Sequence, residues 1–439
     1  MSCRLWPPLL GLTLLLAACA SEQRPLGAVC QGICAKPDGP VPLMPSDEER
    51  RAASEEPSAT DAMASETLRG QIRDLMRRKA DAVPRGIPEH ALDDLPLVEE
   101  GALRVLALSS GGAYGAFGAG FLNGWSEQTE GERVRPDAFD VVTGVSAGAL
   151  LATHAFLGRE GDAVLAEQYT TISTKDVLEE RPLLSALFAN ALFDTGPLRR
   201  TLEGLVTSAL LDRVAEATAL DEDGVPARLL LVLAVDLDSG LPHILDLGAI
   251  ARDVNAPDRI GRYVDALMAS SAIPVAFPPV FIDGAMHVDG GARLALFFNR
   301  FMRDQRAAID DVAIPAPKLD IIVNAEVTVA PKCTKNTLTG IGRRSLDVVL
   351  NQLTLDGLYR TVSEAERDGF DVRYVTAEGS GCAQPRDSAD PFERRFLRCL
   401  FAFGQEVGSG AAPFETGLDG FPDLAIGAGT QAGPLCPPG

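Results

Sequence analysis

One serine of this chain lies in a sequence that could make it a nucleophile. Ser146 is the central residue of Gly-Val-Ser-Ala-Gly, Gly144–Gly148. In a nucleophile elbow the serine occupies a sharp turn between a strand and a helix, where the glycines avoid clashes and the hydroxyl points out of the sheet. The short apolar run 139–143 and the helix-like stretch 147–157 supply that order of elements. The alternative is an ordinary glycine-flanked helix start capped by the serine.

A serine hydroxyl needs a general base, and the histidines of this chain are poorly placed to supply one. Only three follow Ser146, at positions 154, 243 and 287. His154 lies on the predicted helix directly after the elbow, and His243 follows a proline in an expected hairpin. An α/β-hydrolase triad runs Ser, acid, His, so His287 would need its acid in the short segment before it. A histidine-assisted esterase stays open as an alternative. Ser-x-x-Lys chemistry is excluded because no serine has a lysine three residues on.

A carboxylate is the other candidate base. Asp289 is followed by Gly290 and Gly291 and comes after an apolar stretch. The two glycines would let the backbone bring Asp289 close to another loop. Asp-Gly is also common in turns, and taken alone the tripeptide is more simply interpreted as one.

The elements that would position these residues alternate between strand and helix. Apolar runs typical of buried strands alternate with stretches of helical spacing. The expected strands are 103–108, 139–143, 228–236, 319–323 and 372–376, and the later helices are 260–271 and 346–366. This alternation predicts an α/β layered domain. Residues 401–439 are rich in Gly and Pro and are expected to form an irregular tail.

Four blocks, in this order, resemble the patatin-like phospholipase family. They are Leu108–Leu122 with its glycine-rich loop, the Gly144–Gly148 pentapeptide, the strand around Asp236 and Gly240, and Ala266–Gly291 ending in Asp-Gly-Gly. The resemblance spans residues 103–298 and is looser to 376. It implies a three-layer α/β/α sandwich with a mainly parallel central sheet.

The resemblance also implies roles for individual residues. Patatin-like enzymes use a Ser-Asp dyad without histidine, so Ser146 would be the nucleophile and Asp289 the base. The N–H groups of Gly111, Gly112 and Ala113 would form the oxyanion hole, which needs preorganised donors. The further motif positions are Ser110, Gly115, Gly144, Gly148, Gly290 and Gly291. The implied activity is hydrolysis of lipid carboxylic esters, of phospholipase A or lysophospholipase type, through an acyl-enzyme and without cofactor or metal.

Two positions depart from the family pattern. Ser110 replaces the first glycine of the usual Gly-Gly-Gly run, and Tyr114 stands where the family commonly has Arg. The missing positive charge puts a preference for phospholipid headgroups in doubt. A non-catalytic lipoprotein that binds lipid in the same pocket is therefore a second hypothesis.

The N-terminus has the features of a bacterial lipoprotein signal. Arg4 precedes the apolar run 9–18, which is too short to span a bilayer and ends in small residues before Cys19. Cleavage before an acylated Cys19 would tether the chain to a membrane. Ala20, rather than Asp, follows, and this favours the outer membrane, facing either the periplasm or the exterior. An ordinary cleaved signal peptide is the alternative.

The chain is thus expected to comprise five segments. They are a signal peptide 1–18, a flexible tether 19–62, an N-terminal helical segment 63–100 with Leu68, Ile72 and Leu75 on one face, a catalytic domain 101–376, and a C-terminal extension 377–439. The formal net charge of −21, without a basic patch, makes nucleic acid an improbable partner.

The number of cysteines is consistent with an exported protein. Besides Cys3 and Cys19, six remain, at positions 30, 34, 333, 382, 399 and 436. An even number in an oxidising compartment suggests up to three disulfides. Because none lies between residues 35 and 332, they are expected to brace the periphery rather than the catalytic core. A zinc site is the weaker alternative, since none of the four histidines has ligand spacing from a Cys pair.

Overall fold

The computed structural model describes residues 68, 70–79, 102–129, 134–181, 190–298, 316–329, 333–385 and 390–418. The expected signal peptide, Cys19 and the tether lie outside these residues. Within them, no helix has both the length and the apolar character needed to cross a membrane.

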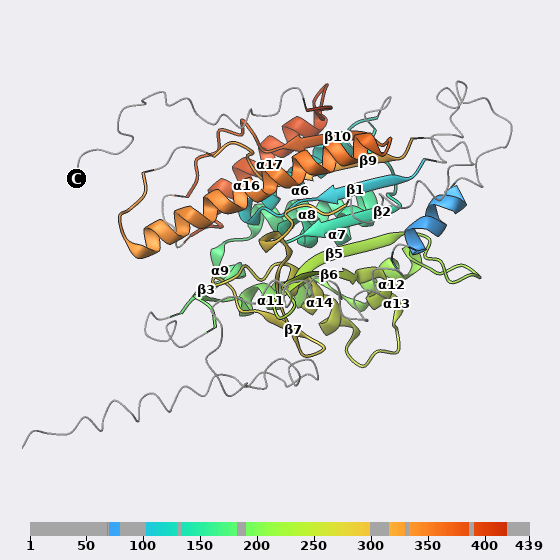
Figure 1. Cartoon of the computed structure of the whole chain (residues 1–439), viewed down its shortest axis with the longest axis horizontal. Helices are drawn as coiled ribbons and strands as arrows, with labels where there is room; N and C mark the ends of the chain where they lie inside the picture. Colours follow the sequence, from blue (N-terminus) through green and yellow to red (C-terminus); the bar gives the residue numbers. More distant parts are fainter. Residues whose placement is uncertain are drawn as a thin grey trace, which may run out of the picture.

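The centre of the fold is a mainly parallel sheet (Figure 1). Its strand order is β10-β9-β1-β2-β5-β8-β7, with β6 also paired to β5. The first five of these strands run parallel, and β6, β7 and β8 join by antiparallel pairing. The strands are β1 Arg104–Leu108, β2 Val141–Val145, β5 Leu229–Asp236, β6 Leu241–Asp246, β7 Val280–Ile282, β8 Ala285–Asp289, β9 Lys318–Val323 and β10 Asp371–Thr376. A separate two-stranded pair joins β3 Glu179–Glu180 and β4 Phe193–Asp194.

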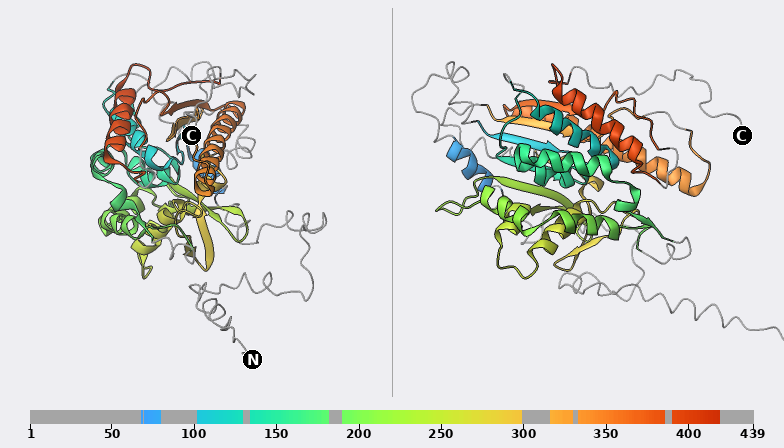
Figure 2. Two further views of the ribbon diagram at one scale, coloured as in Figure 1. Left: turned by 90° about the vertical axis from the view of Figure 1, so that its left-hand side faces the viewer. Right: turned by 180° about the vertical axis from the view of Figure 1, so that it is seen from behind.

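Helices cover both faces of this sheet. Side chains alternate along each strand between two cores, so Leu106 faces one and Val105 the other. The larger layer holds α6 Gly115–Ser126, α7 Ala147–Phe156, α8 Asp162–Thr171, α9 Thr174–Val177, α11 Gly196–Leu205, α12 Ser208–Ala217, α13 Leu247–Arg252, α14 Arg259–Ser270 and α17 Arg394–Ser409. The opposite face is covered by α16 Leu338–Arg367 and by helix 70–79 (Figure 2). The expected three-layer α/β/α fold is confirmed.

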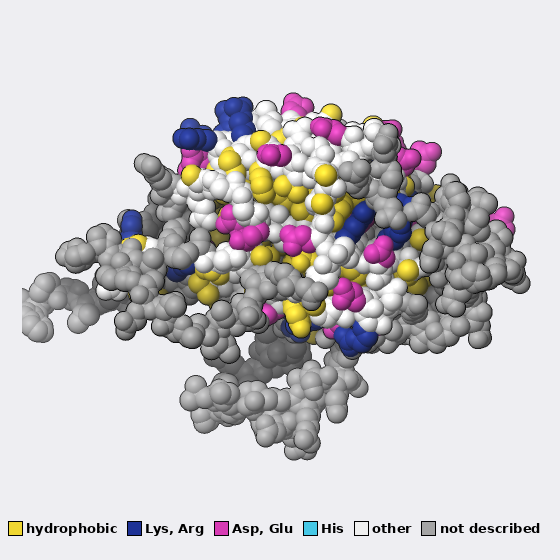
Figure 3. All heavy atoms as spheres, turned by 90° about the horizontal axis from the view of Figure 1, so that it is seen from above, with side chains coloured by type: hydrophobic (Ala, Val, Ile, Leu, Met, Phe, Trp, Pro, Cys, Tyr) yellow, Lys and Arg dark blue, Asp and Glu magenta, His cyan; other side chains and the backbone are white. Residues whose placement is uncertain are grey.

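The predicted N-terminal helix packs against this second core. Leu68, Ile72 and Leu75 are buried there, together with Met76. On the face seen from above, apolar side chains lie across the middle, with acidic and basic side chains around them (Figure 3).

The prediction of an irregular tail from residue 401 is wrong for residues 401–409. They belong to α17, which packs directly on α6. A Cβ on Gly120 would lie 2.0 Å from the carbonyl oxygen of Phe401, and one on Gly404 would lie 2.2 Å from that of Phe117. The glycines that suggested a loop therefore let two helix backbones meet at close range.

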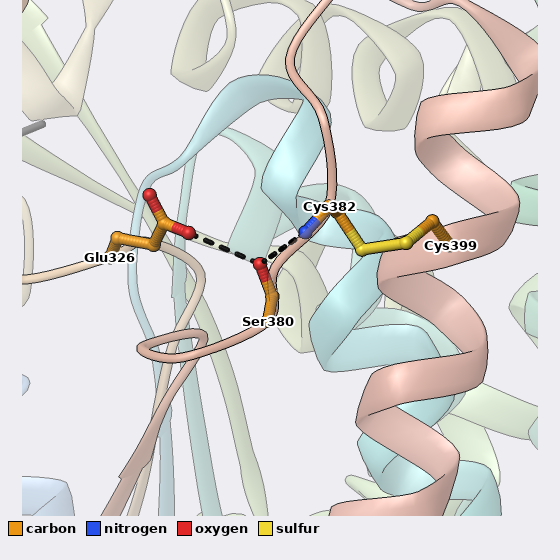
Figure 4. The surroundings of a disulfide bond; sticks show 4 residues. All are labelled: Glu326, Ser380, Cys382 and Cys399. Carbon is orange, nitrogen blue, oxygen red and sulfur yellow. Dashed lines mark hydrogen bonds between the residues drawn. A yellow bond between two sulfur atoms is a disulfide. The ribbon is translucent and has the colours of Figure 1, made fainter.

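One disulfide joins the loop after β10 to α17. Cys382, which is buried, is bonded to Cys399 of α17, which is exposed (Figure 4). Both cysteines lie in the predicted C-terminal extension, outside residues 35–332, so this bond is consistent with the expectation that disulfides brace the periphery. Ser380 connects the same loop to the segment after β9, because its hydroxyl donates to Glu326 at 3.1 Å and accepts from the N–H of Cys382 at 3.3 Å. Cys333 is also disulfide-bonded.

Candidate active site

Ser146 occupies the turn between β2 and α7. Its backbone has φ 53° and ψ −119°, a conformation that costs a non-glycine residue free energy. The flanking glycines are needed because a Cβ on Gly144 would lie 2.6 Å from the carbonyl oxygen of Gly148. A Cβ on Gly148 would lie 2.3 Å from that of Leu108, at the end of β1. The pentapeptide therefore forms a tight strand–turn–helix elbow against the neighbouring strand.

Two serines at the end of α14 hold this turn in place. The N–H of Ser146 donates to Ser270 Oγ at 3.0 Å, and Ser270 Oγ donates to the carbonyl of Leu233 at 2.6 Å. Ser271 Oγ donates to the carbonyl of Ser146 at 3.4 Å. These hydrogen bonds stabilise the strained backbone conformation of Ser146. Neither serine is distinguished by its local sequence, although both lie in the fourth motif block.

Asp289 ends β8 directly opposite the elbow. Its Oδ2 accepts a hydrogen bond of 2.6 Å from Ser146 Oγ, and its Oδ1 accepts one of 2.7 Å from the N–H of Gly291. A Cβ on Gly290 would lie 2.4 Å from the carbonyl oxygen of Leu233, so only glycine fits there. The Asp-Gly-Gly turn thus lets the backbone approach β5 while it aims the carboxylate at the serine.

The surroundings of Asp289 favour its protonated form more than water does. Both Ser146 and Asp289 are 5% exposed. Burial raises the pKa of Asp289 from 3.8 to about 6, against the opposing effect of the hydrogen bonds from Ser146 and Gly291. The carboxylate is therefore ionised at neutral pH, yet its pKa is close enough to neutrality for it to take up a proton.

The glycine-rich loop between β1 and α6 presents free backbone donors. Among the described residues, the N–H groups of Gly111, Gly112 and Ala113 have no acceptor. On either side, the N–H of Ser110 donates to Ala295 and that of Tyr114 to Gly111. Such unpaired donors at a helix start suit a developing anion.

This loop lies against both the elbow and the Asp-Gly-Gly turn. A Cβ on Gly115 would lie 3.1 Å from the Cβ of Ala147, the residue after the serine. A Cβ on Gly291 would lie 3.2 Å from the Cβ of Ser110. The structure therefore brings together all three segments that the sequence analysis singled out.

Asn324, at the end of β9, holds the loop and was not found from the sequence. Its Nδ2 donates to the carbonyl of Ser109 at 2.8 Å, and its N–H donates to Ser109 Oγ at 2.8 Å. Ser109 Oγ in turn donates to the carbonyl of Ser110 at 2.7 Å. A Cβ on Gly111 would lie 1.7 Å from the carbonyl oxygen of Asn324, so the loop rests directly on this residue.

The two departures from the family pattern have different surroundings. Ser110 lies beside Gly291, as described above. Tyr114 packs edge-on against Phe396 of α17 with ring centres 5.5 Å apart, and its hydroxyl accepts from Gln384 at 3.2 Å. Burial raises the pKa of Tyr114 to about 12, so the ring is neutral. The site therefore has a neutral aromatic ring, held against the C-terminal helix, in place of the usual cation.

The histidines form a separate arrangement. Nδ1 of His243 and Nε2 of His287 are 2.6 Å apart, and Nδ1 of His287 is 3.1 Å from the carbonyl of Ala285. Burial lowers the pKa of His154 to about 4. In the described residues, no histidine is a hydrogen-bond partner of Ser146. The same residues contain no group of three or more His, Cys, Asp or Glu that could hold a metal ion.

The fold and the site together define a class: an α/β protein with a serine on a strand–helix elbow, a buried aspartate on its hydroxyl and a glycine-rich loop of free N–H groups beside both. Residues 106–301 match the patatin-like phospholipase family. The chain therefore contains a patatin-like phospholipase domain, and the family resemblance is confirmed.

This chain is similar to two known proteins. Over an alignment of 246 residues, which covers 50% of this chain, the sequence is 28% identical to a cGAMP-activated phospholipase of Escherichia coli (strain TW11681). The matched part of this chain spans 61% of the length of that relative. The chain also aligns with the crystal structure of VipD from Legionella pneumophila over 70% of this chain and 67% of the other, at 12% identity and a TM-score of 0.25. That score is too low to support any conclusion about fold or function.

Proposed function

We propose that this chain is an exported lipid acyl hydrolase that cleaves carboxylic esters of phospholipids or lysophospholipids. Membership of the patatin-like phospholipase family implies lipid acyl hydrolase activity. The observation that carries the proposal for this chain is the 2.6 Å hydrogen bond from Ser146 Oγ to buried Asp289.

The geometry supports a two-step reaction. Asp289 takes the proton of Ser146 while Oγ bonds to the ester carbonyl carbon. The resulting oxyanion would accept hydrogen bonds from the N–H groups of Gly111, Gly112 and Ala113. The ester C–O bond then breaks, and the proton passes from Asp289 to the leaving alcohol. In the second step Asp289 takes a proton from water, the hydroxide adds to the acyl carbon, and the bond to Ser146 breaks with return of its proton.

Exposed apolar side chains at the same edge of the sheet support a lipid substrate. Leu237 follows the carboxyl end of β5 and is 51% exposed. Val329, in the segment after β9, is also exposed. Val275 is exposed in the segment after α14, and this segment contacts the site because the carbonyl of Ala272 accepts a hydrogen bond from the N–H of Asp289. A lipid approaching Ser146 from this edge would meet apolar surface.

The test replaces each member of the pair. Ser146→Ala and Asp289→Asn should each abolish hydrolysis of p-nitrophenyl esters and of a phospholipid panel, while the circular dichroism spectrum is retained. Matched controls are Ser208→Ala and Asp223→Asn at exposed positions, which should keep wild-type rates. Normal turnover in either site variant would overturn the dyad. Failure of wild-type Ser146 to react with a fluorophosphonate probe would instead favour the non-catalytic, lipid-binding alternative.

The proposed location rests on residues before the described domain. The small residues before Cys19 support a lipid anchor, and Ala20 favours the outer membrane. The disulfide between Cys382 and Cys399 supports an oxidising compartment. Metabolic labelling with radioactive palmitate should mark the wild-type chain and not Cys19→Ala. Equal labelling of the two would contradict the anchor, and fractionation of the envelope membranes checks the outer membrane.

A further inference from the structure

The side chain of Tyr169, near the end of α8, reaches between the first residues of α6 and α7. A Cβ on Gly115, which begins α6, would lie 3.0 Å from Tyr169 Oη and 3.1 Å from the Cβ of Ala147, which begins α7. Tyr169 Oη and the Cβ of Ala147 are therefore within about 6 Å of each other. Because Ala147 directly follows Ser146 and Gly115 directly follows the glycine-rich loop, this hydroxyl lies beside both parts of the active site.

The hydroxyl of Tyr169 has no hydrogen-bond partner in the part of the chain that the structure describes. Two other tyrosine hydroxyls do have partners, since Tyr114 accepts from Gln384 at 3.2 Å and Tyr263 is bonded to Thr153 at 2.7 Å. Burial raises the pKa of Tyr169 above its ordinary value, so the hydroxyl keeps its proton at neutral pH. A donor that stays unpaired beside a nucleophile is available to a substrate.

Helix α8 is anchored at both ends, and this holds the hydroxyl of Tyr169 in place. At the first residue of the helix, Asp162 accepts a hydrogen bond of 2.6 Å from the buried guanidinium of Arg135. Near the other end, the carbonyl of Thr170 accepts one of 2.8 Å from Nε of Arg398 in α17. A donor lowers a reaction barrier most when it is already in position before the reaction begins. The anchoring of α8 therefore suits a catalytic role for Tyr169.

We propose that Tyr169 is a further catalytic residue, whose hydroxyl donates a hydrogen bond to the ester carbonyl oxygen as that oxygen becomes negatively charged. An ester bonded to Ser146 and facing the glycine-rich loop would lie at the same junction between α6 and α7. The inference rests on the proposed function, in which the backbone N–H groups of the loop are the other donors. Asp289 remains the base, and the hydroxyl of Tyr169 keeps its proton throughout the reaction.

Tyr169→Phe tests this role because it removes the hydroxyl and keeps the ring. A donor that acts mainly on the charged oxygen stabilises the transition state more than the bound ester. The variant should therefore lower kcat for p-nitrophenyl butyrate at least ~10-fold with little change in KM. Its Tm should stay the same or rise, because the hydroxyl that is removed has no partner in the free protein.

Tyr263→Phe is the matched control. It makes the same chemical change in the same helical layer, at a buried tyrosine whose hydroxyl is already bonded to Thr153 at 2.7 Å. Loss of that bond should lower Tm, because it leaves a buried hydroxyl without its partner, and should leave kcat unchanged. The two variants are therefore expected to give opposite patterns of stability and activity. A purely structural role for Tyr169 would instead make its variant resemble Tyr263→Phe.

The rate of labelling of Ser146 by a fluorophosphonate probe is the second measurement, because it reports attack by the serine without the deacylation step. Tyr169→Phe should slow labelling about as much as it lowers kcat. An active wild type with equal kcat and labelling rate in Tyr169→Phe overturns this inference alone, and so does a variant that loses Tm and activity together. If wild type neither hydrolyses an ester nor reacts with the probe, the proposed function fails and this inference fails with it.

Discussion

Ser146 Oγ and Asp289 Oδ2, which are 143 residues apart in the chain, are joined by a hydrogen bond of 2.6 Å. Each comes from the end of a strand, β2 and β8, and the strand between them in the sheet is β5. The pairing of the two residues therefore depends on the order of strands in the sheet and not on local sequence. It also determines the pH dependence of the site.

Activity should rise with pH through about 6. Only the ionised form of Asp289 can take the proton of Ser146, and burial raises its pKa to about 6. A plot of log kcat/KM against pH, with an ester that does not titrate, should have slope 1 below this value and level off above it. A midpoint near 4 would show that the base is a solvated carboxylate, and one above 8 would point to a different group.

Gly111→Ala should lower kcat at least ~100-fold. The new Cβ would lie 1.7 Å from the carbonyl oxygen of Asn324, and since a backbone oxygen cannot turn aside, the loop must shift. One displaced oxyanion donor costs about 10²–10³-fold. Gly204→Ala in α11 is the matched control, because its Cβ meets nothing within 4 Å and alanine favours a helix. Equal activity of the two variants would remove the loop from the proposed oxyanion hole.

The sequence indicated the elbow and the order of elements because these are local patterns. Glycine spacing around Ser146 and the apolar run Leu229–Asp236 each reflect constraints within a few residues. The three-layer fold and Asp289, by contrast, came from a family resemblance. Taken alone, the Asp-Gly-Gly tripeptide is more simply interpreted as an ordinary turn.

The supporting residues could not be found this way. Asn324 and Ser270 lie in mainly apolar stretches, and nothing in their local sequence shows that the fold places them beside Ser109 and Ser146. The glycines of α17 suggest a loop for a related reason. A glycine that makes room for a distant helix looks the same in sequence as one in a loop.

Asn324→Ala should lower kcat about tenfold with little change in KM. It removes the 2.8 Å bond from Nδ2 to the carbonyl of Ser109 and leaves that buried carbonyl without this donor. The loop donors would then be less well aimed at the transition state while ground-state binding is retained. Asn351→Ala is a matched control, because its Nδ2 donates to the carbonyl of Glu326, outside the loop. If Asn324→Ala lowers Tm but leaves kcat unchanged, the residue is structural only.

Removing the disulfide should lower stability more than activity. Cys382 and Cys399 are separated by 17 residues in the chain. A disulfide that closes a loop of this size adds about 3 kcal/mol to the free energy of unfolding. Cys382→Ala/Cys399→Ala should therefore unfold roughly 5–10 °C lower by differential scanning calorimetry. The same loop carries Gln384, the partner of Tyr114. Reduction of this bond in wild type should produce a comparable shift. No shift in either case would show that the bond contributes nothing to stability.

Asp289→Asn should stabilise the protein at alkaline pH while abolishing activity. The pKa of Asp289 is about 6 in the folded chain and 3.8 without the fold, so the folded state holds this proton more tightly. Stability from this group is therefore fully present below pH 3.8 and is lost as pH rises through 6. A neutral amide avoids the loss, and its gain at pH 8 should be on the order of 2–3 kcal/mol. Denaturant unfolding of both proteins at pH 4 and pH 8 checks the sign. If Asp289→Asn raises the free energy of unfolding equally at both pH values, the charge of Asp289 is not the cause of the gain. If the variant is less stable than wild type at pH 8, the carboxylate stabilises the fold.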